Sequence, residues 1–114
     1  KLVFIFFVGY NCHFCIQYGP YTETAVYQKY MDNSNFVAIA IDVWDGTDAQ
    51  VGDFVESTGI NYSMLINGSE VGTAYNMTNN RLMVIDAEGL IRYRGNANAT
   101  AAEVDNTGQV LKNV

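Results

Sequence analysis

The chain has 114 residues, of which 49% are hydrophobic and 16% charged, and its formal net charge is −6. This length suits one domain, which we expect to span residues 1–114, and the hydrophobic content excludes a disordered tail. The negative charge argues against nucleic acid and against anionic membrane surfaces as partners, because neither would attract it.

The first predicted element is the run from Leu2 to Val8. It is apolar on both faces, which is typical of a central strand in a parallel sheet. The run is too short to span a bilayer. Because the chain does not begin with Met, we expect Lys1 to be a boundary in a longer product, and we leave open a secretion signal or membrane anchor upstream of it.

The only two cysteines, Cys12 and Cys15, follow this strand directly, with His13 and Phe14 between them. Two thiols three positions apart at a strand-to-helix junction can close into a disulfide and reopen, and among βαβ elements this spacing predicts a redox-active pair. A structural zinc site normally needs four ligands, and a c-type haem site needs His where Ile16 stands. We therefore expect neither a metal nor another cofactor. A static disulfide stays open as the alternative, although so short a loop restrains the unfolded chain little.

The next elements complete a βαβ unit. A helix is predicted from near Cys12 toward Met31, and it is stopped by the polar run 32–35. The apolar run from Phe36 to Val43 is a second buried strand. Two apolar strands separated by a helix of this length predict a parallel pair with a right-handed crossover.

Turn and capping signals divide the remainder of the chain. Residues 47–50 have the Thr-x-x-Gln form of a capping box and open a helix that Gly59 closes. A short extended segment (62–66), a short helix (69–75), a hairpin (82–86 and 90–94, with Gly89 in the turn) and a C-terminal helix after a second capping box (100–103) follow. This order predicts an α/β three-layer fold, with a four-stranded mixed sheet covered by helices on both faces.

Four Asn-x-Ser/Thr sequons occur, at Asn61, Asn67, Asn76 and Asn98. This number favours an extracytoplasmic domain that is exposed to glycosylation, although an Asn-rich composition also raises the number of such matches.

The order of elements, with Cys-x-x-Cys at the start of the first helix, resembles the thioredoxin fold across nearly the whole chain. Within that fold it is most similar to the TlpA-type extracytoplasmic thiol-disulfide oxidoreductases. Pro20 stands where this family keeps a proline that bends the active-site helix. The other segments that carry the resemblance are 54–65, 82–86, Gly89 and 92–93.

The sequence also departs from the family pattern. Asn11 replaces the usual Trp before the first cysteine, and Gln17 and Tyr18 stand where many members carry a Glu. Asn80, in the loop 78–81, occupies the position of the usual cis-proline. A non-proline cis bond costs about 3 kcal/mol, so we expect a trans bond at Asn80 and an altered loop for pairing with a substrate peptide.

The resemblance implies a thiol-disulfide oxidoreductase that acts on protein thiols or disulfides outside the cytoplasm. Cys12, exposed at a helix N-terminus, would be the attacking sulfur, because the helix dipole and free backbone N–H groups favour its thiolate and lower its pKa. Cys15, shielded one turn deeper, would resolve the mixed disulfide.

The alternative is a non-catalytic interaction or structural module. A peroxide-reducing relative is a third class, but the expected Thr and Pro-rich loop before the attacking cysteine are missing.

Several neighbours receive supporting roles. A protonated His13 would stabilise the thiolate, whereas a neutral His13 would simply face solvent. Phe14 is either an apolar tip for docking a partner chain or a simple surface aromatic. Tyr10 and Trp44 either flank the site or pack in the core or at its rim. Asp42 or Asp45, at the carboxyl end of the second strand, would be the proton acceptor for Cys15 or an ordinary loop acid.

Overall fold

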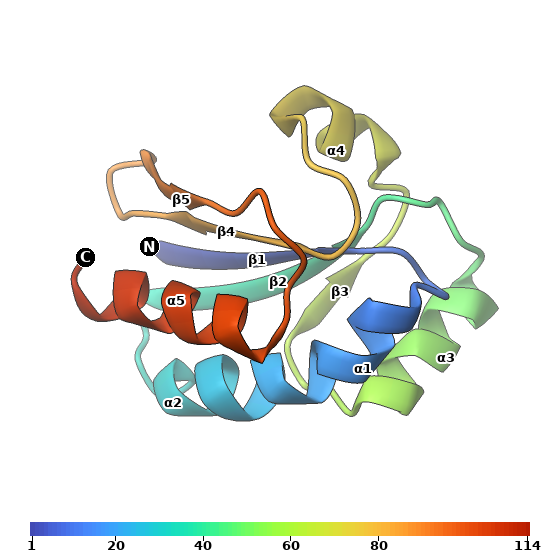
Figure 1. Cartoon of the computed structure of the whole chain (residues 1–114), viewed down its shortest axis with the longest axis horizontal. Helices are drawn as coiled ribbons and strands as arrows, with labels where there is room; N and C mark the ends of the chain where they lie inside the picture. The colour runs from blue at the N-terminus through green and yellow to red at the C-terminus, as the bar shows by residue number, and fades with distance from the viewer.

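The computed structural model describes residues 1–114 and contains one five-stranded mixed sheet in the order β3-β2-β1-β4-β5 (Figure 1). The strands are β1 (Leu2–Val8), β2 (Phe36–Asp42), β3 (Ser63–Leu65), β4 (Arg81–Ile85) and β5 (Ile91–Arg94). Strand β1 pairs in parallel with β2 and antiparallel with β4, and β3 pairs in parallel with β2. The predicted α/β fold with a mixed sheet is confirmed.

The predicted number of four strands is wrong by one, because β3 joins the sheet as an edge strand. The sequence predicts the extended segment but not its pairing, with Ser63 opposite Ile39 and Leu65 opposite Ile41. Three residues are too few for an alternating pattern to show, so only pairing with β2 makes this segment a strand.

The first helix is interrupted rather than uniform. It comprises α1 (His13–Thr22), the π-helical segment η1 (Glu23–Tyr27) and α2 (Gln28–Tyr30). Pro20 lies inside α1 and lacks the N–H that would bond to the preceding turn. The N–H of Glu23 donates to the carbonyls of Gly19 and Pro20, at the point where the wider turns begin. Pro20, where the family resemblance implies a bend, is thus followed by a π-helical segment.

The other helices are α3 (Asp48–Thr58), α4 (Ser69–Tyr75) and α5 (Ala101–Lys112). The capping box of α3 is confirmed: Thr47 Oγ1 accepts the N–H of Gln50 at 3.2 Å, and Gln50 Oε1 accepts the N–H of Thr47 at 2.9 Å. Gly59 ends α3 with a φ of 69°, which glycine adopts without strain. None of the helices combines the length and the apolarity needed to cross a lipid bilayer.

The second predicted capping box is only half formed. Thr100 Oγ1 accepts the N–H of Glu103 at 3.4 Å. The buried carboxylate of Glu103 instead accepts the Tyr93 hydroxyl at 2.6 Å, which ties α5 to β5. Desolvation and this bond raise the pKa of Tyr93 to about 12. The Tyr93 hydroxyl has therefore replaced the backbone N–H of Thr100 as the hydrogen-bond partner of Glu103.

Helices cover the two faces of the sheet unequally. The larger core lies between the sheet and the layer of α1, α3 and α5, and Phe4, Phe6 and Val8 of β1 point into it. Ile5 and Phe7 point to the other face, where α4 lies opposite α1, α2 and α5 and covers one end of the sheet (Figure 1). Strand β1 is apolar throughout because both of its faces are buried.

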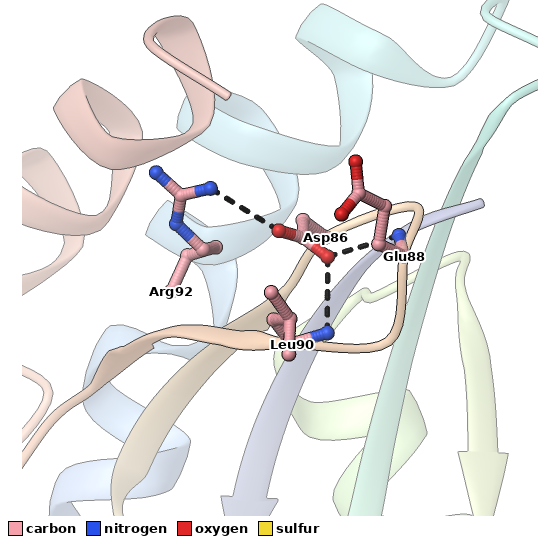
Figure 2. A network of polar contacts seen from close by, with 4 residues as sticks. All are labelled: Asp86, Glu88, Leu90 and Arg92. Atoms are coloured by element: carbon pink, nitrogen blue, oxygen red, sulfur yellow. Dashed lines mark hydrogen bonds and ion pairs between the residues drawn. The ribbon is translucent and has the colours of Figure 1, made fainter.

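Asp86 organises the hairpin turn between β4 and β5 (Figure 2). One carboxylate oxygen accepts the N–H groups of Glu88 at 2.9 Å and Leu90 at 3.0 Å, and the other lies 3.2 Å from Arg92 Nη1. These contacts, with the Leu90 N–H as the largest contributor, lower the pKa of Asp86.

Asp86→Asn is expected to destabilise the protein at pH 7 but not in acid. The pKa of Asp86 is lower in the folded chain than its usual value of about 3.9. Its stabilising effect is therefore fully present above that value and is lost as the pH falls through the folded pKa. Urea unfolding at pH 7 and at about pH 2.5 would measure the difference between wild type and variant. An equal difference at both pH values would contradict this account.

Candidate active site

Cys12 and Cys15 form a disulfide at the start of α1, with their Cα atoms 5.2 Å apart. After β1 the chain turns through Gly9, whose carbonyl accepts the N–H of Cys12 at 3.0 Å. Cys12 is the N-cap of α1, and its Sγ accepts the N–H of Cys15 at 3.2 Å. The backbone thus directs a donor at one sulfur of the pair, at the positive end of the helix dipole.

Cys12 is more covered than the sequence predicts. Cys15 is fully buried, as expected for the deeper sulfur, but only 5% of Cys12 is exposed. The prediction of an exposed attacking sulfur is therefore wrong in degree. The reason is a loop far along the chain: the side-chain amide of Asn79 lies on the sulfur, with Nδ2 3.2 Å from Cys12 Sγ.

His13 and Phe14 both project from the first turn of α1. Both side chains are exposed, Phe14 by 48%, and their rings pack edge to face with centroids 5.8 Å apart. His13 makes no hydrogen bond to Cys12, so the polar side chain in contact with the sulfur is Asn79. Phe14 remains available as an apolar contact beside the disulfide.

Tyr10 and Trp44 meet beside the disulfide turn. Their rings pack edge to face with centroids 6.1 Å apart, and Trp44 is 43% exposed. Trp44 lies so close to Gly9 that any Cβ there would overlap the indole ring. An indole from the loop after β2 therefore flanks the site, while Asn11, at the family's usual Trp position, is an exposed turn residue.

Asp42 and Asp45 organise loops, and neither makes a hydrogen bond to Cys15. The fully buried carboxylate of Asp42 accepts the backbone N–H groups of Trp44 at 3.0 Å and Gly46 at 2.7 Å. Asp45 accepts the hydroxyl of Ser69 at 2.5 Å and its N–H at 3.0 Å, and these bonds lower the pKa of Asp45. The interpretation of these acids as ordinary loop residues fits the structure, with the addition that they shape the loop that carries Trp44.

Asn80 is a strained and buried residue at the end of the loop that faces the disulfide. All peptide bonds are trans, as we predict for Asn80, and its φ is 60°. Its N–H donates to the Phe7 carbonyl at 2.6 Å, and its carbonyl accepts the N–H of Ala99 at 3.1 Å. The side chain is 1% exposed, and neither of its polar atoms has a hydrogen-bond partner. Burying such a group without partners costs about 1–3 kcal/mol.

Asn79 is a site residue that the sequence does not predict. The only available signal was its position directly before Asn80, in a loop that the family resemblance places opposite the dithiol. No periodicity or motif in a single sequence reports that a side chain in this loop touches a sulfur 67 positions earlier.

A groove of about 480 Å³ lies between the loop after β2 and α4, and Thr78 is also part of its lining. Helix α4 is held at both ends, by Asp45 at Ser69 and by Arg94, whose Nη2 donates to the Tyr75 carbonyl at 2.8 Å and the Asn76 carbonyl at 2.6 Å. The residues that line the groove are Val43, Trp44, Ser69, Gly72, Thr73, Asn76, Met77 and Thr78.

All four sequon asparagines have exposed side chains. They differ in how their amides are used. Asn61 Nδ2 donates to the buried carboxylate of Glu23 at 3.2 Å, whereas Asn98 uses only its oxygen, which accepts Arg81 Nη1 at 2.7 Å. Asn76 lies in the groove beside Met77 and Thr78.

A mixed sheet in this order, with a disulfide at the N-terminus of the helix after its first strand, is the thioredoxin-like fold of the thiol-disulfide oxidoreductases. The model of the Redoxin family matches residues 1–111. The chain therefore belongs to the Redoxin family.

Solved structures share this fold. The chain is 29% identical to a putative protein disulfide isomerase from Bacteroides thetaiotaomicron, with a TM-score of 0.75 and coverage of 98% of this chain and 74% of that chain. A putative thiol:disulfide interchange protein DsbE from Chlorobium tepidum has a TM-score of 0.84 at 16% identity, with coverage of 99% and 79%. A secreted Mycobacterium tuberculosis disulfide oxidoreductase, described as homologous to DsbE of E. coli, has a TM-score of 0.72 at 20% identity, with coverage of 98% and 81%.

A search of curated proteins found no match. The resemblance to thioredoxin-fold oxidoreductases of the TlpA type is confirmed by the family match and by these structural neighbours.

Proposed function

We propose that this chain works as a single thioredoxin-like domain that exchanges disulfides with protein partners through Cys12 and Cys15. The observation that carries the proposal is the disulfide at the N-terminus of α1, where Cys12 Sγ accepts both the Cys15 N–H and the Asn79 amide. Donors aimed at a sulfur favour its thiolate, which is the form that attacks disulfides.

In the proposed reaction the reduced protein delivers two electrons to its partner. The Cys12 thiolate attacks a disulfide sulfur of the partner, and the bond between the two partner sulfurs breaks as the mixed disulfide forms. The first partner sulfur leaves as a thiolate and takes a proton. Cys15, deprotonated in turn, attacks Cys12, which restores the intramolecular disulfide and releases the second partner thiolate. The reverse sequence oxidises a partner dithiol.

The partner is proposed to approach over the exposed side chains beside the disulfide. Phe14 and Trp44, 48% and 43% exposed, offer apolar surface next to the turn that holds Cys12. Both backbone groups of Asn80 are already paired within the protein, which directs any backbone pairing with a partner peptide to Asn79.

A static disulfide is the second candidate, and the 5% exposure of Cys12 favours it. In that case the chain would be an interaction or structural module with the same fold. The two functions differ in redox behaviour. Structural disulfides have potentials below about −300 mV, whereas exchange-competent pairs have higher potentials.

The test is equilibration of the protein with glutathione or dithiothreitol buffers, with the thiol content measured after acid quenching. A potential above about −300 mV, together with reduction of a protein disulfide that Cys12→Ser abolishes, would support the oxidoreductase. A lower potential together with an unreactive Cys12 thiol in the reduced protein would overturn it in favour of the structural module.

The site of action is proposed to lie outside the cytoplasm, free or attached to a membrane anchor in a longer product. The four exposed sequons support this, and one structural neighbour is described as secreted. Asn67, Asn76 and Asn98 are the better glycan acceptors, since Asn61 already uses Nδ2 to hold Glu23. Intact mass before and after glycosidase treatment, measured on protein secreted from a eukaryotic host, would detect the glycans. An unmodified chain would contradict the prediction that these sequons are glycosylated.

A further inference from the structure

The side chain of Asn79 is the only one, apart from Cys15, that contacts the sulfur of Cys12 through a hydrogen bond or a covalent bond. Its Nδ2 is 3.2 Å from Cys12 Sγ, and its oxygen accepts the Thr78 hydroxyl at 3.1 Å. The Thr78 bond occupies the oxygen, so that the donating end of the carboxamide faces the sulfur.

The loop around Asn79 is anchored on its far side. The N–H of Asn80 donates to the carbonyl of Phe7, near the end of β1, which leads directly into the disulfide turn. Arg81 Nη1 lies 3.2 Å from the Asn80 carbonyl and 2.7 Å from Asn98 Oδ1. Buried Asn80 keeps its unusual φ of 60° because these contacts fix it. The folded loop therefore fixes the position of Asn79 opposite Cys12, so Asn79 does not behave as a freely rotating surface side chain.

A hydrogen bond to this sulfur changes in strength with the redox state. A disulfide sulfur is neutral and a weak acceptor, whereas a thiolate is charged, and hydrogen bonds to charged groups contribute about 1.5–3 kcal/mol. A donor that is already in place therefore stabilises the reduced protein more than the oxidised one.

We propose that Asn79 is a positioning residue for the dithiol: its carboxamide holds Cys12 Sγ by a hydrogen bond that strengthens when the disulfide opens, which favours the thiolate and the reduced state. This inference rests on the proposed redox function, and it names the side chain that tunes it. His13, the neighbour that the sequence suggests for this role, is exposed and packs against Phe14 instead.

The test compares Asn79→Leu and Asn79→Asp with wild type. Leu fills a similar volume without a donor, and Asp keeps the shape but places a carboxylate beside the sulfur. In the reduced protein, the thiolate population at a pH below the Cys12 pKa is expected to fall about tenfold for Asn79→Leu and further for Asn79→Asp. At a pH above the Cys12 pKa, where the thiolate predominates in the reduced protein, the reduction potential is expected to fall by about 30 mV for each tenfold loss of thiolate stability. Thiolate absorbance against pH and equilibration with glutathione measure the two quantities.

Two controls separate this role from a general effect on folding. Asn106→Asp adds the same charge on an exposed position of α5 and is expected to leave both quantities unchanged. Thr78→Val removes the hydroxyl that orients Asn79 and is expected to lower the thiolate population and the reduction potential, as Asn79→Leu does. Thr78→Ser keeps the hydroxyl and is expected to leave both quantities unchanged. Cooperative unfolding of each oxidised variant verifies that it is folded.

The outcomes distinguish this inference from the proposed function. If wild type exchanges disulfides but the Asn79 variants titrate and equilibrate as wild type does, the role of Asn79 is overturned. If wild type is inert while the Asn79 variants lose thiolate in the reduced protein, the hydrogen bond stands and the proposed redox function falls.

Discussion

Cys15→Ser is expected to accumulate as a covalent adduct with its protein partner, with turnover reduced to the background rate of the reducing buffer. Cys15 is fully buried and lies one helical turn from Cys12, so it is the only thiol within reach of a mixed disulfide at Cys12. Without it, attack by Cys12 still occurs but release does not. Non-reducing electrophoresis and mass spectrometry of the variant, incubated with an oxidised model protein, would show the adduct.

Cys12→Ser is the matched control, because it keeps the buried thiol and removes the candidate attacking sulfur. It is expected to form no adduct. Adduct formation by Cys12→Ser but not by Cys15→Ser would reverse the roles assigned to the two cysteines, and adduct formation by neither would favour the static disulfide.

The elements that could be predicted from sequence are those that local signals encode. Leu2–Val8 is a strand because every residue is apolar, and α3 begins and ends where Thr47 and Gly59 supply its caps. The sequence does not place β3 in the sheet, because its three residues form a strand only through their pairing with β2. The second capping box is incomplete for a related reason, because the Glu103 carboxylate accepts the hydroxyl of Tyr93, which lies outside its helix.

The candidate site shows the same division. The spacing of Cys12 and Cys15 predicts the redox pair. Tyr10 and Trp44 lie beside the pair because they follow strand ends that meet at one edge of the sheet. The Asn79 contact and the low exposure of Cys12 depend on a loop that returns from 67 positions away, so no local pattern encodes them.

Asp42→Ala is expected to lower the free energy of unfolding by about 2–4 kcal/mol, because two backbone N–H groups lose their buried acceptor. These groups belong to Trp44, at 3.0 Å, and Gly46, at 2.7 Å, in the loop that flanks the disulfide turn. Urea unfolding of the oxidised protein would measure the loss. Asp42→Asn keeps one oxygen acceptor and is expected to lose less.

The same variant separates a loop-holding role for Asp42 from a proton-accepting one. If Asp42 only holds the loop, the mixed disulfide in Asp42→Ala is resolved with the pH dependence of wild type. If Asp42 accepts the proton of Cys15, the resolving step slows and its pH profile moves. Asp53→Ala, on the exposed face of α3, is the matched control and is expected to change stability by no more than about 0.5 kcal/mol. Unchanged stability in Asp42→Ala, or a displaced pH profile, would contradict the conclusion that this buried carboxylate serves to hold the loop through its hydrogen bonds.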